Sequence, residues 1–316
     1  MHKNKPFKIS LKIIIIIISY GFIFYKIKTT SVDWESLFIF STPPLFIAIA
    51  LMPFNWIFEA VKWKALLKDI EFISLKKSIK GIGLGILMGT ATPNRIGEYY
   101  GRTVVLEKQN RTKGSLATMV GSLSQVLTTI TLGLLAWSYL FNQITFIETK
   151  KLQLLFIGGL WAVMIFLFVL YYNIGIVKKI LLWFNVSKTY IDKVGFLSRY
   201  KKLELTEVLM FSFLRYAIFA TQYIFLLYAF HVDISIVNAL LSIFIIYLII
   251  TFIPHFSISE IGVRGSVAIL IMQNYTENIY GVAAAAGTLW IINIAFPAFI
   301  GSILWILSQG KKKSSH

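Results

Sequence analysis

Long apolar stretches constrain this chain more than any other feature. The first contains six consecutive isoleucines at residues 13–18, and several later ones approach the roughly 20 residues that a helix needs to cross a bilayer. Only 14% of the residues are charged, against about 25% in an ordinary soluble domain. A β-barrel would instead show short alternating segments. The sequence therefore predicts an all-α, polytopic integral membrane helical bundle.

The apolar pattern predicts about eight spans. Complete spans are expected over residues 9–25, 44–61, 115–141, 152–172, 208–228, 236–253 and 280–307. Two further apolar stretches, 79–92 and 262–272, are short. The first ends just before Pro93, and the second follows Pro254. We treat residues 1–316 as a single transmembrane domain, with 1–150 and 151–316 as candidate halves.

The net charge of +17 is distributed between the spans, which argues against binding of nucleic acid. Both termini are basic, and segments 61–80, 94–113 and 173–204 hold six, five and seven Lys or Arg residues. The positive-inside rule therefore predicts that both termini and these segments face the cytoplasm, in the cytoplasmic membrane.

This orientation requires that stretch 79–92 returns to the side it entered from, and that 262–272 completes a crossing. In a second model both stretches are re-entrant, and the C-terminus lies outside. Segment 173–204 alternates basic and apolar residues, so it is expected to form either interfacial helices or a solvated basic loop.

The segment "TPNRIGEYYGR" interrupts an apolar stretch with charged residues. Pro93 ends the preceding helix, and a helix that starts there would place Arg95, Glu98 and Arg102 on one face. Irregular backbone at membrane depth is tolerated where it is buried in protein or lines a wet cavity. We include Asn94, which follows Pro93, among the candidate substrate-binding residues.

A second segment, "FIPHFSISEIGVRGSVAIL", has a similar plan. Pro254 and His255 precede Glu260, and Arg264 follows four residues later. The two glutamates lie 162 residues apart, about half the chain. Paired proline-interrupted segments in two halves indicate a transporter's substrate site. An internal repeat stays open, because the two halves share little identity.

Arginine presents a planar fork that suits phosphate or carboxylate, and glutamate holds that fork in place. We expect a cavity in which Arg95, Arg102 and Arg264 hold an anionic lipid headgroup. The alternative is that the same charges form structural ion pairs that join broken helices. In either case, intramembrane ionisable groups are expected to face one another or a cavity.

Other polar residues inside the spans give weaker indications. Arg215 is expected to reach the interface or to pair with a carboxylate. The remaining ones are Asn55 and Glu59, which share a helix face, and Gln125, Thr128 and Thr129, which are expected to form helix–helix hydrogen bonds.

The sequence predicts no cofactor, no metal site and no enzyme activity. It contains no cysteine, and none of its four histidines has a His or Cys neighbour at ligand spacing. A P-loop motif for nucleotide binding is also absent. Transport driven by ATP binding to this chain is therefore not expected.

The motifs resemble those of the lysylphosphatidylglycerol synthase transmembrane-region family of flippase-like proteins. "TPNRIGEYYGR" is similar to its P-x-R-x-G-E motif, "EAVKWKALLK" to the end of its second span, and "IPHFSISEIGVRG" to its second motif. The chain departs from the family at Gly265, where an acid is usual, and at "SLSQVLTTI", which lacks the family's charged residues. The resemblance identifies a divergent standalone member.

The resemblance implies a protein that binds or translocates an anionic lipid such as a phospholipid. No aminoacyl-transferase domain is recognisable, so lysyl-lipid synthesis is not expected. Two other functions stay open. One is an accessory subunit of an envelope-assembly machine, working with a lipid-modifying enzyme or a glycosyltransferase. The other is a polyprenyl-phosphate-dependent transferase with Glu98 or Glu260 as base.

Overall fold

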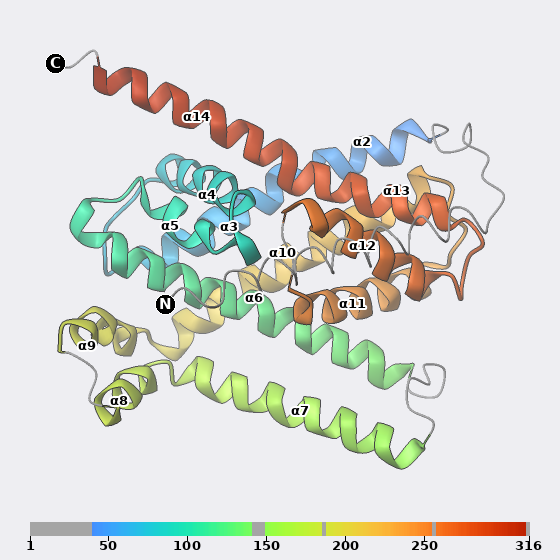
Figure 1. The fold of residues 1–316 in the computed structure, drawn as a ribbon, viewed down its shortest axis with the longest axis horizontal. Coiled ribbons are helices and arrows are strands. Elements are labelled where there is room, and N and C mark those ends of the chain that lie inside the picture. Colours follow the sequence, from blue (N-terminus) through green and yellow to red (C-terminus); the bar gives the residue numbers. More distant parts are fainter. Residues whose placement is uncertain (1–39, 141–148, 185–187, 255–256, 314–316) are drawn as a thin grey trace, which may run out of the picture.

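The computed structural model describes residues 40–140, 149–184, 188–254 and 257–313. Within these ranges the chain is almost entirely helical and contains no strand, which confirms the all-α prediction (Figure 1). The predicted first span, 9–25, and His255 lie outside the described residues. The helices are α2 (Thr42–Ala50), α3 (Met52–Leu67), α4 (Leu75–Thr90), α5 (Gly97–Thr103), α6 (Arg111–Tyr139), α7 (Lys150–Tyr172), α8 (Ile176–Trp183), α9 (Lys188–Val194), α10 (Lys202–Ala229), α11 (Ile236–Phe252), α12 (Ser257–Met272), α13 (Ile279–Trp290) and α14 (Phe296–Lys313).

Short non-α turns join some of these helices. Three are 3₁₀ turns: η2 (Pro93–Arg95), η3 (Lys108–Asn110) and η4 (Gly195–Arg199). The fourth, η5 (Ile291–Ala295), is a π-helical turn that joins α13 to α14 without a break. Segment 173–204 thus contains α8, α9 and η4, so it is helical rather than an irregular loop.

Five continuous helices among the described residues are long and apolar enough to cross a membrane. They are Thr42–Leu67, Lys108–Tyr139, Lys150–Tyr172, Lys202–Ala229 and Ile279–Ile306. Each coincides with a predicted span. Helix α11 has 17 residues, a length of about 25 Å at 1.5 Å per residue, and falls short of this group.

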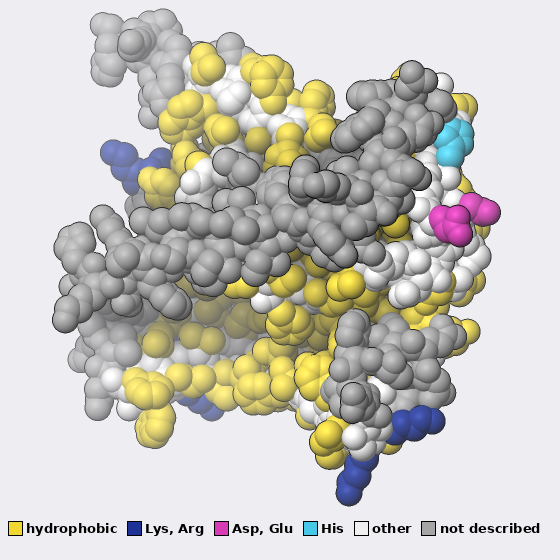
Figure 2. Space-filling view, turned by 45° about the vertical axis from the view of Figure 1, so that its right-hand side comes forward, with side chains coloured by type: hydrophobic (Ala, Val, Ile, Leu, Met, Phe, Trp, Pro, Cys, Tyr) yellow, Lys and Arg dark blue, Asp and Glu magenta, His cyan; other side chains and the backbone are white. Residues whose placement is uncertain are grey.

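The described residues expose many large apolar side chains, as expected for a surface that faces lipid. Large side chains such as Phe46, Leu155 and Phe166 are more than half exposed. In the part of Figure 2 that is coloured by residue type, hydrophobic side chains predominate, and the Lys and Arg side chains that are visible lie at its edges. Because a soluble monomer rarely exposes apolar area on this scale, the protein is a multi-pass membrane protein.

One end of the molecule, called the basic end here, gathers the end of α3 and the starts of α4, α6 and α10. Glu71 accepts hydrogen bonds from Lys77 (2.8 Å) and from the amide of Asn110 (3.0 Å). Partial burial raises the pKa of this carboxyl, but these two partners outweigh it and hold the pKa below its ordinary value. Tyr200 donates to the Leu66 carbonyl at 2.6 Å. Helix α14 ends on the same side (Figure 1).

Two helical hairpins enter the bundle from opposite ends. The α4–α5 hairpin starts and finishes at the basic end. The α11–α12 hairpin starts and finishes at the other end, where Asn278 donates to the carbonyls of Phe230 (3.0 Å) and His231 (3.2 Å). The hairpin tips meet inside the bundle, where α12 contacts η2.

This arrangement agrees with neither topological model in full. Residues 262–272 do not complete a crossing as the first model requires, because α11 and α12 form a hairpin that returns to the end where it entered. Because α12 returns to the end where α11 began, α13, η5 and α14 can together run from that end to the basic end (Figure 1). The C-terminal helix and the three basic segments therefore lie at the same end, as in the first model. The second model correctly makes both broken stretches re-entrant, but it separates the C-terminal helix from the basic segments, which the structure does not.

The glycines of α4 allow other elements to approach its backbone closely. A Cβ at Gly85 would lie 2.5 Å from the Arg102 side chain, and one at Gly81 would lie 2.7 Å from the Trp63 ring. Helix α14 also comes close to α4, because a Cβ at Gly301 of α14 would lie 2.3 Å from the carbonyl oxygen of Gly83. Small residues serve this purpose in membrane helix interfaces generally.

We predict that Gly301→Ala separates α4 from α14 and destabilises the protein by about 1–3 kcal/mol, because backbone atoms would have to move. Thermal unfolding of the purified protein in detergent measures the effect. Gly158→Ala in α7 is the matched control, since a Cβ there meets no atom within 4 Å. Equal melting temperatures for the two variants would contradict the prediction.

Candidate functional site

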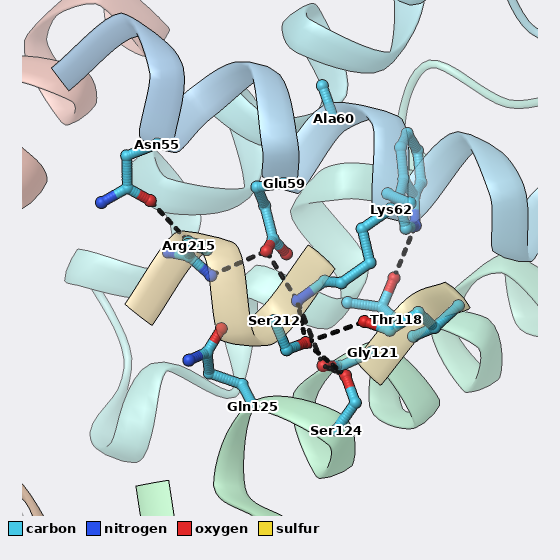
Figure 3. A network of polar contacts seen from close by, with 12 residues as sticks. Asn55, Glu59, Ala60, Lys62, Thr118, Gly121, Ser124, Gln125, Ser212 and Arg215 are labelled. Carbon is cyan, nitrogen blue, oxygen red and sulfur yellow. Dashed lines mark hydrogen bonds and ion pairs between the residues drawn. The ribbon is translucent and has the colours of Figure 1, made fainter. Parts of the chain in front are cut away.

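The carboxylate of Glu59, on α3, is the centre of a buried charged network (Figure 3). Its side chain is 5% exposed. It pairs with Lys62 one helical turn later (2.8 Å), with Arg215 of α10 (2.7 Å) and with Arg102 of α5. One carboxylate thus faces three cations from three helices.

Lys62 is fully buried, and its ammonium is held by more than the ion pair. It lies 3.3 Å from both the Gly121 carbonyl of α6 and the Ser212 hydroxyl of α10. Ser212 and Ser124 hydrogen bond to each other at 2.7 Å. These contacts fix α3 against α6 and α10 next to Glu59, as Figure 3 shows.

The tip of the first hairpin has an irregular backbone. Asn94 and Arg95 adopt left-handed conformations, with φ of 48° and 56°. Such a conformation costs a residue with a side chain roughly 1–2 kcal/mol. The Thr92 hydroxyl accepts a hydrogen bond from the Gly97 amide at 2.7 Å. The prediction that the helix begins at Pro93 is therefore wrong, because α5 begins only at Gly97.

The charged residues of this motif nevertheless meet. Glu98 pairs with Arg95 at 3.2 Å and with Arg102 four residues later. Arg102 is 5% exposed and bridges Glu98 to Glu59. The hairpin tip is thereby tied to α3 through a single guanidinium group.

The second motif contributes one arginine from the other side. Arg264 of α12 pairs with Glu260 (2.7 Å) and donates to the Tyr247 hydroxyl of α11 (2.9 Å). Its guanidinium also lies 5.4 Å from the centre of the Tyr247 ring. Pro254 follows the extended Ile253 at the end of α11, as expected for a residue before proline.

Both motifs border one cavity of about 110 Å³ at the hairpin tips. Its walls are formed by Asn55, Trp56, Glu59, Ile82, Ile86, Arg95, Glu98, Arg102, Arg215, Phe219, Arg264, Asn293 and Ile294. Together with the paired Lys62 and Glu260, the site holds five positive charges against three negative ones, an excess of two.

Three wall residues have buried donors without a hydrogen-bond partner among the described residues. These are the indole nitrogen of Trp56 and the Nε atoms of Arg95 and Arg102. Buried donors are normally satisfied, so each such group in a native structure calls for an explanation. Excess positive charge and unpartnered donors together favour an anionic, oxygen-rich ligand.

The structure brings together most of the predicted site residues. The cavity is lined by Arg95, Glu98, Arg102 and Arg264. Glu260 does not line it but forms an ion pair with Arg264. Asn94 does not line it; its side chain is exposed, and its backbone makes the turn that follows Pro93.

The sequence indicated some site residues only weakly. Arg215 does pair with a carboxylate, that of Glu59, but both also line the cavity. Thr128 and Thr129 bond to carbonyls of their own helix instead of a neighbouring one. Asn293, in the π-helical turn, was not predicted from the sequence. Its side chain accepts a hydrogen bond from Asn55 at 3.0 Å and donates one to Gln222 at 3.2 Å. Isolated π turns often mark functional positions.

No group of three or more His, Cys, Asp or Glu residues that could hold a metal occurs within the described ranges. The charged groups of the site are its arginines, its glutamates and Lys62, and neighbouring polar groups orient them.

We predict that Glu59→Gln destabilises the fold by about 3–5 kcal/mol, because it leaves buried cations uncompensated. Thermal unfolding in detergent tests this. Glu207→Gln, on the exposed surface of α10, is the control and should change stability little. In the double variant Glu59→Gln/Arg215→Gln, part of the loss should be recovered, since the two side chains are coupled. Equal stability of Glu59→Gln and Glu207→Gln would contradict the assignment.

Comparison with known proteins identifies the family. No curated protein matches the sequence. The family model for the lysylphosphatidylglycerol synthase TM region matches residues 9–304, which is nearly the whole chain. The match includes both hairpins and every wall of the charged cavity. The chain therefore belongs to the lysylphosphatidylglycerol synthase transmembrane-region family.

Proposed function

We propose that this protein binds anionic membrane lipids by their phosphate group in the charged cavity, and that it moves them between the leaflets of the cytoplasmic membrane. The observation that carries the proposal is the excess of two positive charges around a cavity inside a membrane bundle. Uncompensated charge at membrane depth is costly, and it is normally found where a ligand or ion binds.

The arginines around the cavity suit phosphate. A guanidinium group donates two parallel hydrogen bonds to phosphate oxygens. Arg95 still has an unpartnered donor, and the side chain of Arg215 is 32% exposed. A phosphate that entered would compete with Glu98 and Glu59 for these arginines, so binding would loosen the ion pairs that join the hairpin to α3 and α10.

The cavity size fits a headgroup fragment rather than a whole lipid. Its volume of about 110 Å³ lies well below the roughly 300–1,000 Å³ of pockets that enclose a drug-sized ligand. In the proposed mechanism the phosphate occupies the cavity, and the acyl chains stay in the surrounding lipid. The hairpins enter from opposite ends, so a headgroup at their tips lies between the two leaflets.

The orientation of the protein in the membrane is proposed from the charges at the basic end. We place the basic end at the cytoplasmic face, where anionic lipids attract Lys and Arg. Helix α8 lies at this end and exposes Trp183 beside Phe184, with Lys178 and Lys179 also exposed. This combination is typical of an interfacial helix.

We predict that purified protein in liposomes exposes an inner-leaflet, headgroup-labelled phospholipid to an impermeant reductant. Arg95→Ala and Arg264→Ala should each slow this at least about tenfold, because a hydrogen bond from a charged group contributes about 1.5–3 kcal/mol. Glu98→Gln removes the carboxylate that competes with phosphate for Arg95 and Arg102, so the phosphate should be released more slowly and the rate should also fall. Arg199→Ala is the matched control, since Arg199 is exposed in η4, outside the cavity.

Two results would contradict the proposal. The first is lipid movement at the same rate in all variants, which would mean that the cavity is not on the path. The second is no movement of any lipid by the folded wild-type protein. The charged residues would then serve only to hold the broken helices together, or the protein would act as an accessory subunit of an enzyme.

A further inference from the structure

A second cavity adjoins the charged one. It has a volume of about 150 Å³ and is lined by Asn55, Gln125, Thr129, Arg215, Tyr216, Phe219 and Tyr247. Three of these residues, Asn55, Arg215 and Phe219, also line the charged cavity. The two cavities are linked again through Arg264, which lines the first and hydrogen bonds to Tyr247 of the second. A ligand with two parts could therefore occupy both.

The chemistry of the second cavity differs from that of the first. Apart from Arg215 at the shared wall, its lining is uncharged and combines amide, hydroxyl and aromatic groups. The rings of Phe219 and Tyr247 meet edge to face at 4.8 Å, and Tyr216 and Tyr247 at 6.4 Å. Aromatic faces carry partial negative charge and attract the weakly positive C–H groups of a saturated ring.

Two polar atoms in this lining have no partner among the described residues. They are the amide oxygen of Gln125 and the hydroxyl of Tyr216, whose side chain is only 4% exposed. The first is an acceptor, and the second both donates and accepts. A neighbouring hydroxyl group satisfies both, because it too donates and accepts. A buried polar atom left without a partner costs about 1–3 kcal/mol.

The lining argues against a cationic headgroup. Among the described residues no carboxylate lines this cavity to balance an ammonium group, and the guanidinium of Arg215 lies in its wall. A second positive charge would thus meet repulsion in a buried site. An uncharged group with several hydroxyls meets no such penalty.

We propose that the second cavity binds a polyhydroxylated ring, a sugar or a cyclitol, that is esterified to the phosphate held in the first. This rests on the proposed function and narrows its substrate class to lipids with a hydroxylated, uncharged ring beyond the phosphate. Arg215, at the shared wall, contacts the phosphate, while Gln125 and Tyr216 select the ring.

Binding to purified wild-type protein in detergent tests this with three probes: phosphatidylinositol, phosphatidic acid and phosphatidylethanolamine. Phosphatidylinositol should bind about tenfold or more tightly than phosphatidic acid, which has the phosphate without the ring. Gln125→Leu and Tyr216→Phe should each weaken phosphatidylinositol binding by about fivefold to tenfold and leave phosphatidic acid unchanged. Tyr228→Phe, also on α10 but outside both cavities, is the control and should bind as wild type does.

The outcomes separate this inference from the proposed function. Equal affinity for phosphatidylinositol and phosphatidic acid, together with weaker binding of both by Arg95→Ala, would overturn the ring site and leave the phosphate site standing. The same conclusion holds if Tyr216→Phe weakens both lipids equally. Absence of binding of all three lipids to folded protein would overturn both. Melting temperatures of the variants verify that each is folded.

Discussion

The carboxylate of Glu59 forms ion pairs with three cations that reach it from three parts of the chain. Lys62 comes from the same helix, Arg102 from the first hairpin and Arg215 from α10. Burial of an unpaired charge costs several kcal/mol even after relaxation, so these elements must assemble together or not at all. The cavity depends on this assembly, because Glu59, Arg102 and Arg215 form part of its wall.

The hairpins give the site its position. A continuous helix would satisfy its own backbone and would offer only side chains at mid-bundle. A hairpin tip also places turns and charged residues there, provided that protein surrounds them. The left-handed Arg95 shows that the tip is held in a strained form, and strain of this kind concentrates at functional sites. The glycines of α4 allow α14 and α5 to enclose the tip closely.

The arrangement of charge explains how a cavity lined by arginines fits inside an apolar bundle. Each arginine of the cavity has at least one carboxylate partner, so no guanidinium lies unpaired at membrane depth. Three glutamates do not balance five cations, however, and the surplus faces the cavity. Under the proposed function, an anionic group that enters would complete the balance.

The sequence by itself determined the membrane class, most of the long helices, the two proline breaks and the family, because apolar run length and local motifs are encoded in neighbouring residues. It also indicated that Arg95, Glu98 and Arg102 would meet, and that Arg264 would pair with Glu260. Only the tertiary structure decided that Glu59 is the common partner of Arg102 and Arg215, and that α12 returns to the end where α11 began. Those contacts join residues 43 and 156 positions apart, and no local periodicity records which distant helix faces pack together.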